Sequence, residues 1–275
     1  MPESRTQITA EQPLVSRRTS TVPGAGVYFT ALSTKTVSSR CRALRSPRTV
    51  TGSLGTLRVK VRFHDLHGDE KVALANYFQR FPDLKNSRYY SVRVANTLML
   101  VLDSSLDETS GPQGQWLTQA LDTLSGDVDF VFLVLHHPPY TSSSDEKKYG
   151  GGHSARKPEH RLAEMLEARQ QHTNARFVVF SGHVHNYERH EHGGVTYFVL
   201  GGAGAHAYPI ERAAGDPFQS KEINYHYLLV EVDRRHLKFT MNRLDLSSGK
   251  VVWTQPDSLE ITVPAPASAR AGNDH

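Results

Sequence analysis

The chain has 275 residues, which is enough for one α/β domain with a substantial core, and its single cysteine excludes an internal disulfide and a cysteine-based metal cluster. Its net charge of +4 is unevenly distributed: residues 1–64 hold 11 Lys and Arg against 2 Glu, whereas the remainder holds 21 basic and 26 acidic residues. The basic character therefore belongs to the first segment, and we expect no nucleic-acid-binding face on the folded part.

Location signals are absent from the sequence. No stretch approaches ~18 continuous apolar residues, so the sequence predicts no transmembrane helix and no membrane partner. The first residues, Met1 to Arg5, lack the apolar core of a secretory signal. The default expectation is a cytoplasmic protein.

Residues 1–60 form a basic segment rich in Ser, Thr and Arg, without a sustained helical or strand period. This composition predicts poor order. The segment contains no Asp and no His, and all 15 histidines lie at or after His64. Because composition and charge change abruptly here, we interpret the break as a shift of reading frame near His64. The folded domain is expected to span 61–264, followed by a disordered tail at 265–275.

Elements of the first half follow from apolar spacing. Residues 70–78 predict a short helix that ends at Phe81-Pro82, and residues 89–94 and 97–102 predict two strands. Ser110-Gly111-Pro112 opens a helix whose apolar stripe runs to Leu124.

Two apolar runs in the second half carry the strongest signal. Residues 130–135 end in His136-His137-Pro138-Pro139-Tyr140, and residues 176–180 end in the segment 181–189, Ser-Gly-His-Val-His-Asn-Tyr-Glu-Arg. Both runs are typical of buried parallel strands, beyond whose carboxyl ends ligands bind in α/β sheets. We expect Gly182 to provide the turn that brings the imidazoles together.

The remaining segments complete an α/β pattern. A polar loop over residues 142–156 contains His153 and precedes a helix at about 158–171. Strands are predicted at 195–200, 225–233, 236–243 and 258–263. We expect Gly201 to Gly204 to allow a tight backbone approach near the site, since no helical pattern follows them.

The two strand-end motifs resemble the C-terminal half of the calcineurin-like metallophosphoesterases. Gly-His-Val-His-Asn-Tyr-Glu-Arg, at 182–189, is most similar to the purple acid phosphatase branch, and the resemblance covers roughly residues 64–262. It implies an α/β/β/α sandwich, with two mixed sheets flanked by helices and with incomplete N-terminal strands. It also implies hydrolysis of phosphomonoesters by metal-activated water at a dinuclear centre of Fe, Mn or Zn.

The resemblance assigns roles residue by residue. His136 and His183 resemble ligands of one metal, and His185 resembles a ligand of the other. His64 corresponds to the family's catalytic histidine, and His137 and His153 are candidates for substrate binding. Tyr187, Glu188 and Arg189, which follow Asn186, are expected to brace the loop rather than to touch substrate.

The sequence departs from the family upstream. Because no Asp precedes Asp65, the usual Asp-x-His and Gly-Asp blocks are missing, and with them the bridging carboxylate. Three imidazoles could hold one divalent ion, as in a mononuclear zinc or copper site. Three alternatives remain: a phosphoesterase whose activity these gaps impair, an inactive remnant that binds metal or a partner, and nucleic-acid binding by the basic segment.

Overall fold

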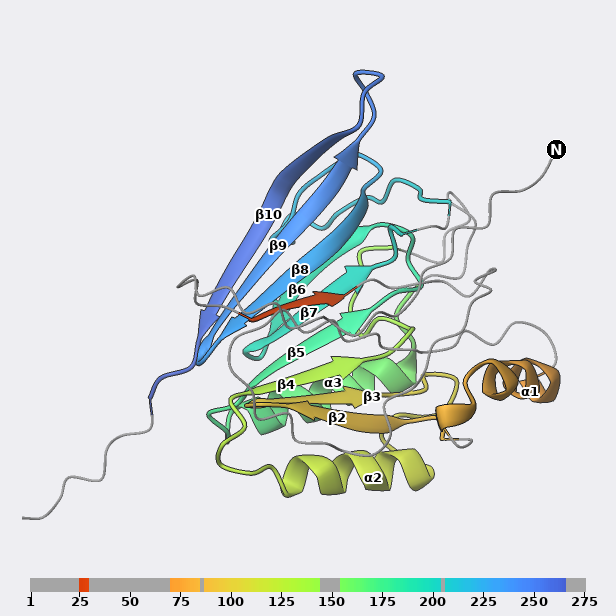
Figure 1. Cartoon of the computed structure of the whole chain (residues 1–275), viewed down its shortest axis with the longest axis vertical. Coiled ribbons are helices and arrows are strands. Elements are labelled where there is room, and N and C mark those ends of the chain that lie inside the picture. Colours follow the sequence, from red (N-terminus) through yellow and green to blue (C-terminus); the bar gives the residue numbers. More distant parts are fainter. Residues whose placement is uncertain (1–24, 30–69, 85–86, 144–153, 204–205, 266–275) are drawn as a thin grey trace, which may run out of the picture.

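The computed structural model describes residues 25–29, 70–84, 87–143, 154–203 and 206–265, with backbone alone for the first range. His64 and His153 lie outside these residues, so their predicted roles stay predictions. The described chain forms two sheets flanked by helices (Figure 1), which confirms the predicted α/β class with two stacked sheets.

The larger sheet, which we call sheet B, has six strands in the order β2-β3-β4-β5-β7-β6. Its four central strands pair in parallel, and an antiparallel strand closes each edge. The strands are β2 (Tyr90–Val94), β3 (Thr97–Val101), β4 (Phe130–Val134), β5 (Arg176–Ser181), β6 (Tyr187–His192) and β7 (Val195–Leu200). Every residue of β4 and β7 is buried, as expected of strands covered on both faces.

The smaller sheet, sheet A, has the order β1-β8-β9-β10, and its described strands all pair antiparallel. They are β1 (Ala25–Phe29), β8 (Tyr225–Asp233), β9 (His236–Asp245) and β10 (Val252–Thr262). Mixed pairing therefore belongs to sheet B alone. Strand β1 lies within the segment 1–60, for which the sequence predicted no regular element.

Two apolar cores hold these layers together. One core joins the facing sides of the two sheets through residues such as Phe132, Phe198 and Phe239. The other joins the opposite side of sheet B to the helices α2 (Gly111–Asp122) and α3 (Lys157–Gln170). The helix α1 (Glu70–Arg80) and the 3-10 turn η1 (Pro82–Leu84) precede β2. Among the described residues, no helix is both long and apolar enough to cross a membrane.

Strand β6 was not predicted, because Tyr-Glu-Arg-His-Glu-His has no apolar run. It pairs with β7 across Gly193-Gly194, both with positive φ (54° and 83°), which is the geometry favoured by tight hairpins. Tyr187, Glu188 and His190 are nevertheless buried. Polar partners contributed by other segments explain this burial, and the local sequence does not reveal them.

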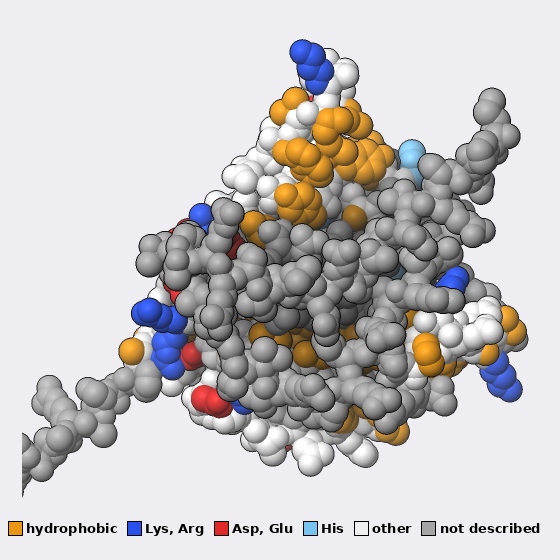
Figure 2. All heavy atoms as spheres, viewed as in Figure 1, with side chains coloured by type: hydrophobic (Ala, Val, Ile, Leu, Met, Phe, Trp, Pro, Cys, Tyr) orange, Lys and Arg blue, Asp and Glu red, His pale blue; other side chains and the backbone are white. Residues whose placement is uncertain are grey.

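The far end of the β9–β10 hairpin carries exposed apolar side chains, which gather beneath the tip in Figure 2. Trp253 is 53% exposed and Val251 is 69% exposed. This end of sheet A contrasts with the closely packed edge of sheet B where the histidines lie.

Candidate metal centre

The ends of β4 and β5 bring the two histidine motifs together. The strands pair in parallel with Val134 opposite Phe180, so both chains leave the sheet at the same edge. The Gly182 N–H then donates to the His136 carbonyl at 3.0 Å, which extends the pairing one step beyond the strands. His136 and His183 therefore meet because the strands end in register.

The chain turns sharply at His183. The Val184 N–H donates to the Gly182 carbonyl (2.7 Å), and the Asn186 N–H donates to the Val184 carbonyl (2.8 Å). Each bond spans two residues, so two γ-turns follow one another. His183, at the centre of the first, has φ +65°. The positive φ thus falls on His183 rather than on Gly182, which corrects our expectation. A non-glycine residue there costs about 1–3 kcal/mol.

Three imidazoles form a cluster at this edge. The Nε2 atom of His136 lies 3.1 Å from Nδ1 of His183, and one ring nitrogen from each of His136, His137 and His183 lies within 4.8 Å of the others. The ring centroids are 4.6 to 5.0 Å apart. His136 is buried and the other two are partly exposed. His137, a candidate for substrate binding in the sequence, also lies within the cluster, and its role in substrate binding stays a prediction.

His185 does not join this cluster. Its Nδ1 atom lies 2.9 Å from the His206 carbonyl, to which it donates, and its ring lies 5.6 Å from that of Tyr208. The sequence-based argument expected a turn at Gly182 to bring the imidazoles of His183 and His185 to one site. Residues two apart share a face in an extended strand, whereas two γ-turns separate the directions of His183 and His185.

Gly201 lets the end of β7 approach the loop, and Gly202 lets it approach the start of β8. A Cβ on Gly201 would lie 1.9 Å from the Val184 carbonyl oxygen, and a Cβ on Gly202 would lie 2.2 Å from the Asn224 carbonyl oxygen. The Gly201 N–H donates to the Asn186 carbonyl (3.1 Å). The predicted tight backbone approach is present, and it holds the turn in place.

The residues after His185 join the loop to sheet A. The Tyr187 hydroxyl donates to Asp257 of β10 (2.7 Å), and the Arg189 guanidinium donates to both oxygens of the same carboxylate (2.9 and 3.0 Å). Burial and the nearby Asp257 carboxylate raise the pKa of Tyr187 well above its ordinary value. These residues brace the loop, as the sequence suggested.

Glu188 fixes the segment that follows His136. Its fully buried carboxylate accepts hydrogen bonds from the Thr141 hydroxyl (2.7 Å) and the Ser142 N–H (2.6 Å). It also lies 3.2 Å from Nε2 of His190, whose Nδ1 is 3.4 Å from Asp216. His190 therefore sits between two carboxylates. This scaffold, Glu188–His190–Asp216, holds the loop and is distinct from the histidine cluster.

A buried acid pair lies at the same edge of the sheet. Glu108 and Glu159 are both inaccessible to solvent, and Arg156 donates from Nε to both oxygens of Glu159 (3.1 and 3.0 Å). Both carboxyl oxygens of Glu108 are buried without a hydrogen-bond partner. Burial and the negative charge of Glu159 raise the pKa of Glu108 to about 8. The Glu108 carboxyl therefore keeps its proton to a higher pH in the folded protein than in the unfolded chain.

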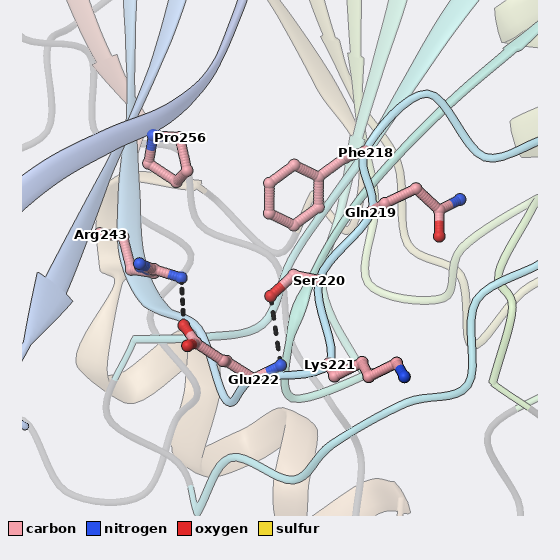
Figure 3. Close-up of a pocket in the computed structure, with 7 residues that line it drawn as sticks. All are labelled: Phe218, Gln219, Ser220, Lys221, Glu222, Arg243 and Pro256. Carbon is pink, nitrogen blue, oxygen red and sulfur yellow. Dashed lines mark hydrogen bonds and ion pairs between the residues drawn. The ribbon is translucent and has the colours of Figure 1, made fainter.

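A cavity of about 330 Å³ lies between the segment that precedes β8 and strands β9 and β10 (Figure 3). It is lined by residues that include Phe218, Ser220 and Pro256, and by the ion pair of Arg243 with Glu222. No histidine lines it. The chemistry that the sequence predicted therefore does not lie in this cavity.

The histidine cluster can hold a metal ion. A zinc–nitrogen bond is ~2.0–2.1 Å, so two nitrogens on one tetrahedral ion lie about 3.3 Å apart. The His136–His183 separation of 3.1 Å is close to this value, and small side-chain movements would bring in His137. Among the described residues, the cluster contains imidazoles and no carboxylate.

Comparison with known proteins gives fold resemblance and no family. No protein-family model matches the sequence, and no curated protein matches it significantly. Among solved structures, a purple acid phosphatase, PPD1, from yellow lupin (Lupinus luteus) seeds is 17% identical, with 65% of this chain and 33% of that chain covered and a TM-score of 0.48.

Two further structures resemble the chain to a similar degree. PhoD is 13% identical, with 64% of this chain and 42% of that chain covered and a TM-score of 0.45. GAP50, the anchor in the inner membrane complex of Plasmodium, is 15% identical, with 66% and 56% covered and a TM-score of 0.43. The chain thus spans about a third to just over half of these proteins. At such scores the overlap says nothing about chemistry.

Proposed function

We propose that this protein is a metal-dependent phosphoesterase of the calcineurin-like type, similar to the purple acid phosphatases, that hydrolyses phosphomonoesters. The observation that carries the proposal is the meeting of His136 and His183 at 3.1 Å, from the two motifs whose resemblance implied a shared metal. Fe, Mn and Zn are the candidate ions. His185 is the candidate ligand of a second ion, through the nitrogen opposite its bond to His206.

A bound cation would supply a Lewis acid that neutralises charge on the phosphoryl group and lowers the pKa of water. Groups of the chain itself hold the candidate ligands in position. Strands β4 and β5 position the imidazoles, and the buried Glu188 holds the segment after His137. His64 is proposed as the acid that protonates the leaving group, and His153 as a group that binds substrate.

The test is hydrolysis of p-nitrophenyl phosphate by the full chain after treatment with chelator and after addition of manganese, iron or zinc. We expect activity that is lost with the chelator, restored by metal, and reduced at least about 100-fold by His183→Ala. His172→Ala is the matched control, because His172 is exposed and lies outside the cluster. Turnover that persists unchanged in His183→Ala would reject this site.

The alternative function is a remnant of the fold that binds metal or a partner without catalysis. The all-imidazole cluster favours this alternative, because a dinuclear centre normally contains a bridging carboxylate and no carboxylate joins the cluster in the described part of the chain. Metal binding without turnover in the same assay would support it.

A further inference from the structure

His137 lies beside His136 and His183, although the family resemblance gives the role of ligand to other histidines. Neighbouring residues on a strand point to opposite faces. Here β4 has ended at Val134 and the chain bends at His136 and His137, and the two ring centroids lie 4.8 Å apart. The ring of His137 lies still closer to that of His183, at 4.6 Å.

Ser104 holds His137 in position through hydrogen bonds to its backbone and its ring. The Ser104 Oγ accepts a hydrogen bond from the His137 backbone N–H (3.1 Å) and lies 2.8 Å from Nδ1 of the same residue. One hydroxyl therefore fixes both the backbone and the ring of His137. Ser104 is only 2% exposed and follows β3, the strand next to β4.

This contact decides which nitrogen a metal can take. An imidazole ligates through an unprotonated nitrogen, and the opposite nitrogen then carries the proton and donates it to a neighbour. With Nδ1 against Ser104, the protonated Nδ1 donates to Oγ and Nε2 becomes the ligand. Metal binding selects this tautomer, and the hydroxyl stabilises it.

Ser104 is itself held by charged groups. The Arg156 guanidinium donates to the Ser104 carbonyl (2.6 Å), and the same guanidinium is bonded to the buried carboxylate of Glu159. Arg156 directly precedes α3 as its N-cap residue. The backbone of Ser104 is thus held near the start of helix α3 as well as at the end of β3.

We infer that His136, His137 and His183 form a single divalent-cation site, in which Ser104 is a positioning residue that presents Nε2 of His137. The inference deepens the proposed function and rests on it for the nature of the bound group. A set of three imidazoles suits Zn²⁺, Co²⁺, Ni²⁺ or Cu²⁺, whereas Mg²⁺ and Ca²⁺ prefer oxygen ligands.

The experiment is a titration of tag-free, metal-free full-length protein with Co²⁺, followed by visible absorption and by calorimetry. We expect one tight site with the intense visible bands of four-coordinate Co²⁺. His137→Ala should weaken binding by at least about 100-fold and Ser104→Ala by about 10–100-fold. Ser104→Thr keeps the hydroxyl and should restore affinity to within about threefold of wild type.

Ser181→Ala is the matched control. Ser181 is also a buried serine beside a motif strand end, but its hydroxyl donates to the Phe198 carbonyl at 3.0 Å and contacts no imidazole. It should leave Co²⁺ affinity within about threefold of wild type, as should His172→Ala, because His172 is exposed and lies outside the cluster. Circular dichroism confirms folding of each variant, and if Ser104→Ala unfolds, the comparison of His137→Ala with His172→Ala decides the question.

Two outcomes would overturn the inference: His137→Ala binds Co²⁺ like wild type, or His185→Ala loses the site and His137→Ala does not. Because the readout is metal affinity, it is separate from turnover. A protein that binds Co²⁺ through His137 without hydrolysing p-nitrophenyl phosphate would support this inference and reject the proposed phosphoesterase. Metal-dependent hydrolysis in a protein that does not need His137 would do the reverse.

Discussion

His183 lies in the loop that leads into β6, and His190 lies on β6 itself. The two histidines are only seven residues apart in the sequence, yet they have different surroundings. His183 is partly exposed, has positive φ, and faces two other imidazoles. His190 is 5% exposed and lies between the carboxylates of Glu188 and Asp216. In the described part of the chain, two carboxylates lie beside the structural His190, whereas no carboxylate joins the cluster of His136, His137 and His183.

The contrast separates two kinds of variant. Changes in the Glu188–His190–Asp216 scaffold should lower the free energy of unfolding, because its groups are buried and bonded to one another. Changes in the histidine cluster should lower metal affinity and leave the metal-free fold nearly intact. A scaffold variant that loses metal affinity without losing stability would contradict this separation, and so would a cluster variant that unfolds the metal-free protein.

Glu188→Ala should give the largest effect on stability. It removes the acceptor of the Thr141 hydroxyl and the Ser142 N–H and leaves His190 with one carboxylate neighbour. Unsatisfied buried groups of this kind cost together about 3 kcal/mol or more. Urea-induced unfolding of the metal-free protein measures the loss.

The control for that variant is Glu191→Ala on the same strand. Glu191 is about half exposed and pairs with Arg189, so the expected change in unfolding free energy is within about 0.5 kcal/mol. Equal losses in the two variants would mean that the scaffold does not stabilise the loop.

The buried acid pair extends the comparison to pH. The pKa of Glu108 is raised from 4.5 to about 8 by burial and by Glu159, so between these values the folded protein binds more protons than the unfolded chain. This carboxyl therefore stabilises the fold less as pH rises from 4.5 toward 8. The expected decrease is at least about 1 kcal/mol, the equivalent of one pKa unit.

Glu108→Gln isolates this contribution, since an amide does not titrate. The free energy of unfolding, measured by heat or urea at about pH 5 and about pH 8, should fall less with rising pH in the variant than in wild type. Parallel curves for the two proteins would show that Glu108 is not protonated in the fold.

The smallest expected effect concerns strain at His183. Its φ of +65° disfavours every residue except glycine, so His183→Gly should be more stable than His183→Ala by about 1 kcal/mol. Both variants should lose the metal site to the same extent. If His183→Ala proves as stable as His183→Gly, the turn does not hold the residue in a strained conformation.

The sequence predicted the parts of this molecule that depend on local pattern. Strand β7 and strand β8 follow from their apolar runs and were found with their predicted bounds. The meeting of His136 and His183 follows from two parallel strands that end at one edge. These features need no knowledge of distant residues.

Features imposed by distant residues could not be predicted. Strand β6 is polar, and its burial depends on Asp257, Asp216 and Thr141. The direction of the His185 side chain depends on two γ-turns. These turns have room because Gly201, just after β7, has no Cβ to meet the Val184 carbonyl. The contact of Ser104 with His137 joins the ends of β3 and β4, and the sequence around either residue does not predict it.

The central claim is that imidazoles from the ends of β4 and β5 share one cation. Anomalous diffraction at the zinc edge, from crystals of the zinc-loaded full chain, tests it most directly. The account predicts one strong peak within ~2.0–2.1 Å of ring nitrogens of His136, His137 and His183. A peak bound by His185 without His137, or an empty cluster in a protein that hydrolyses phosphate esters, would contradict it.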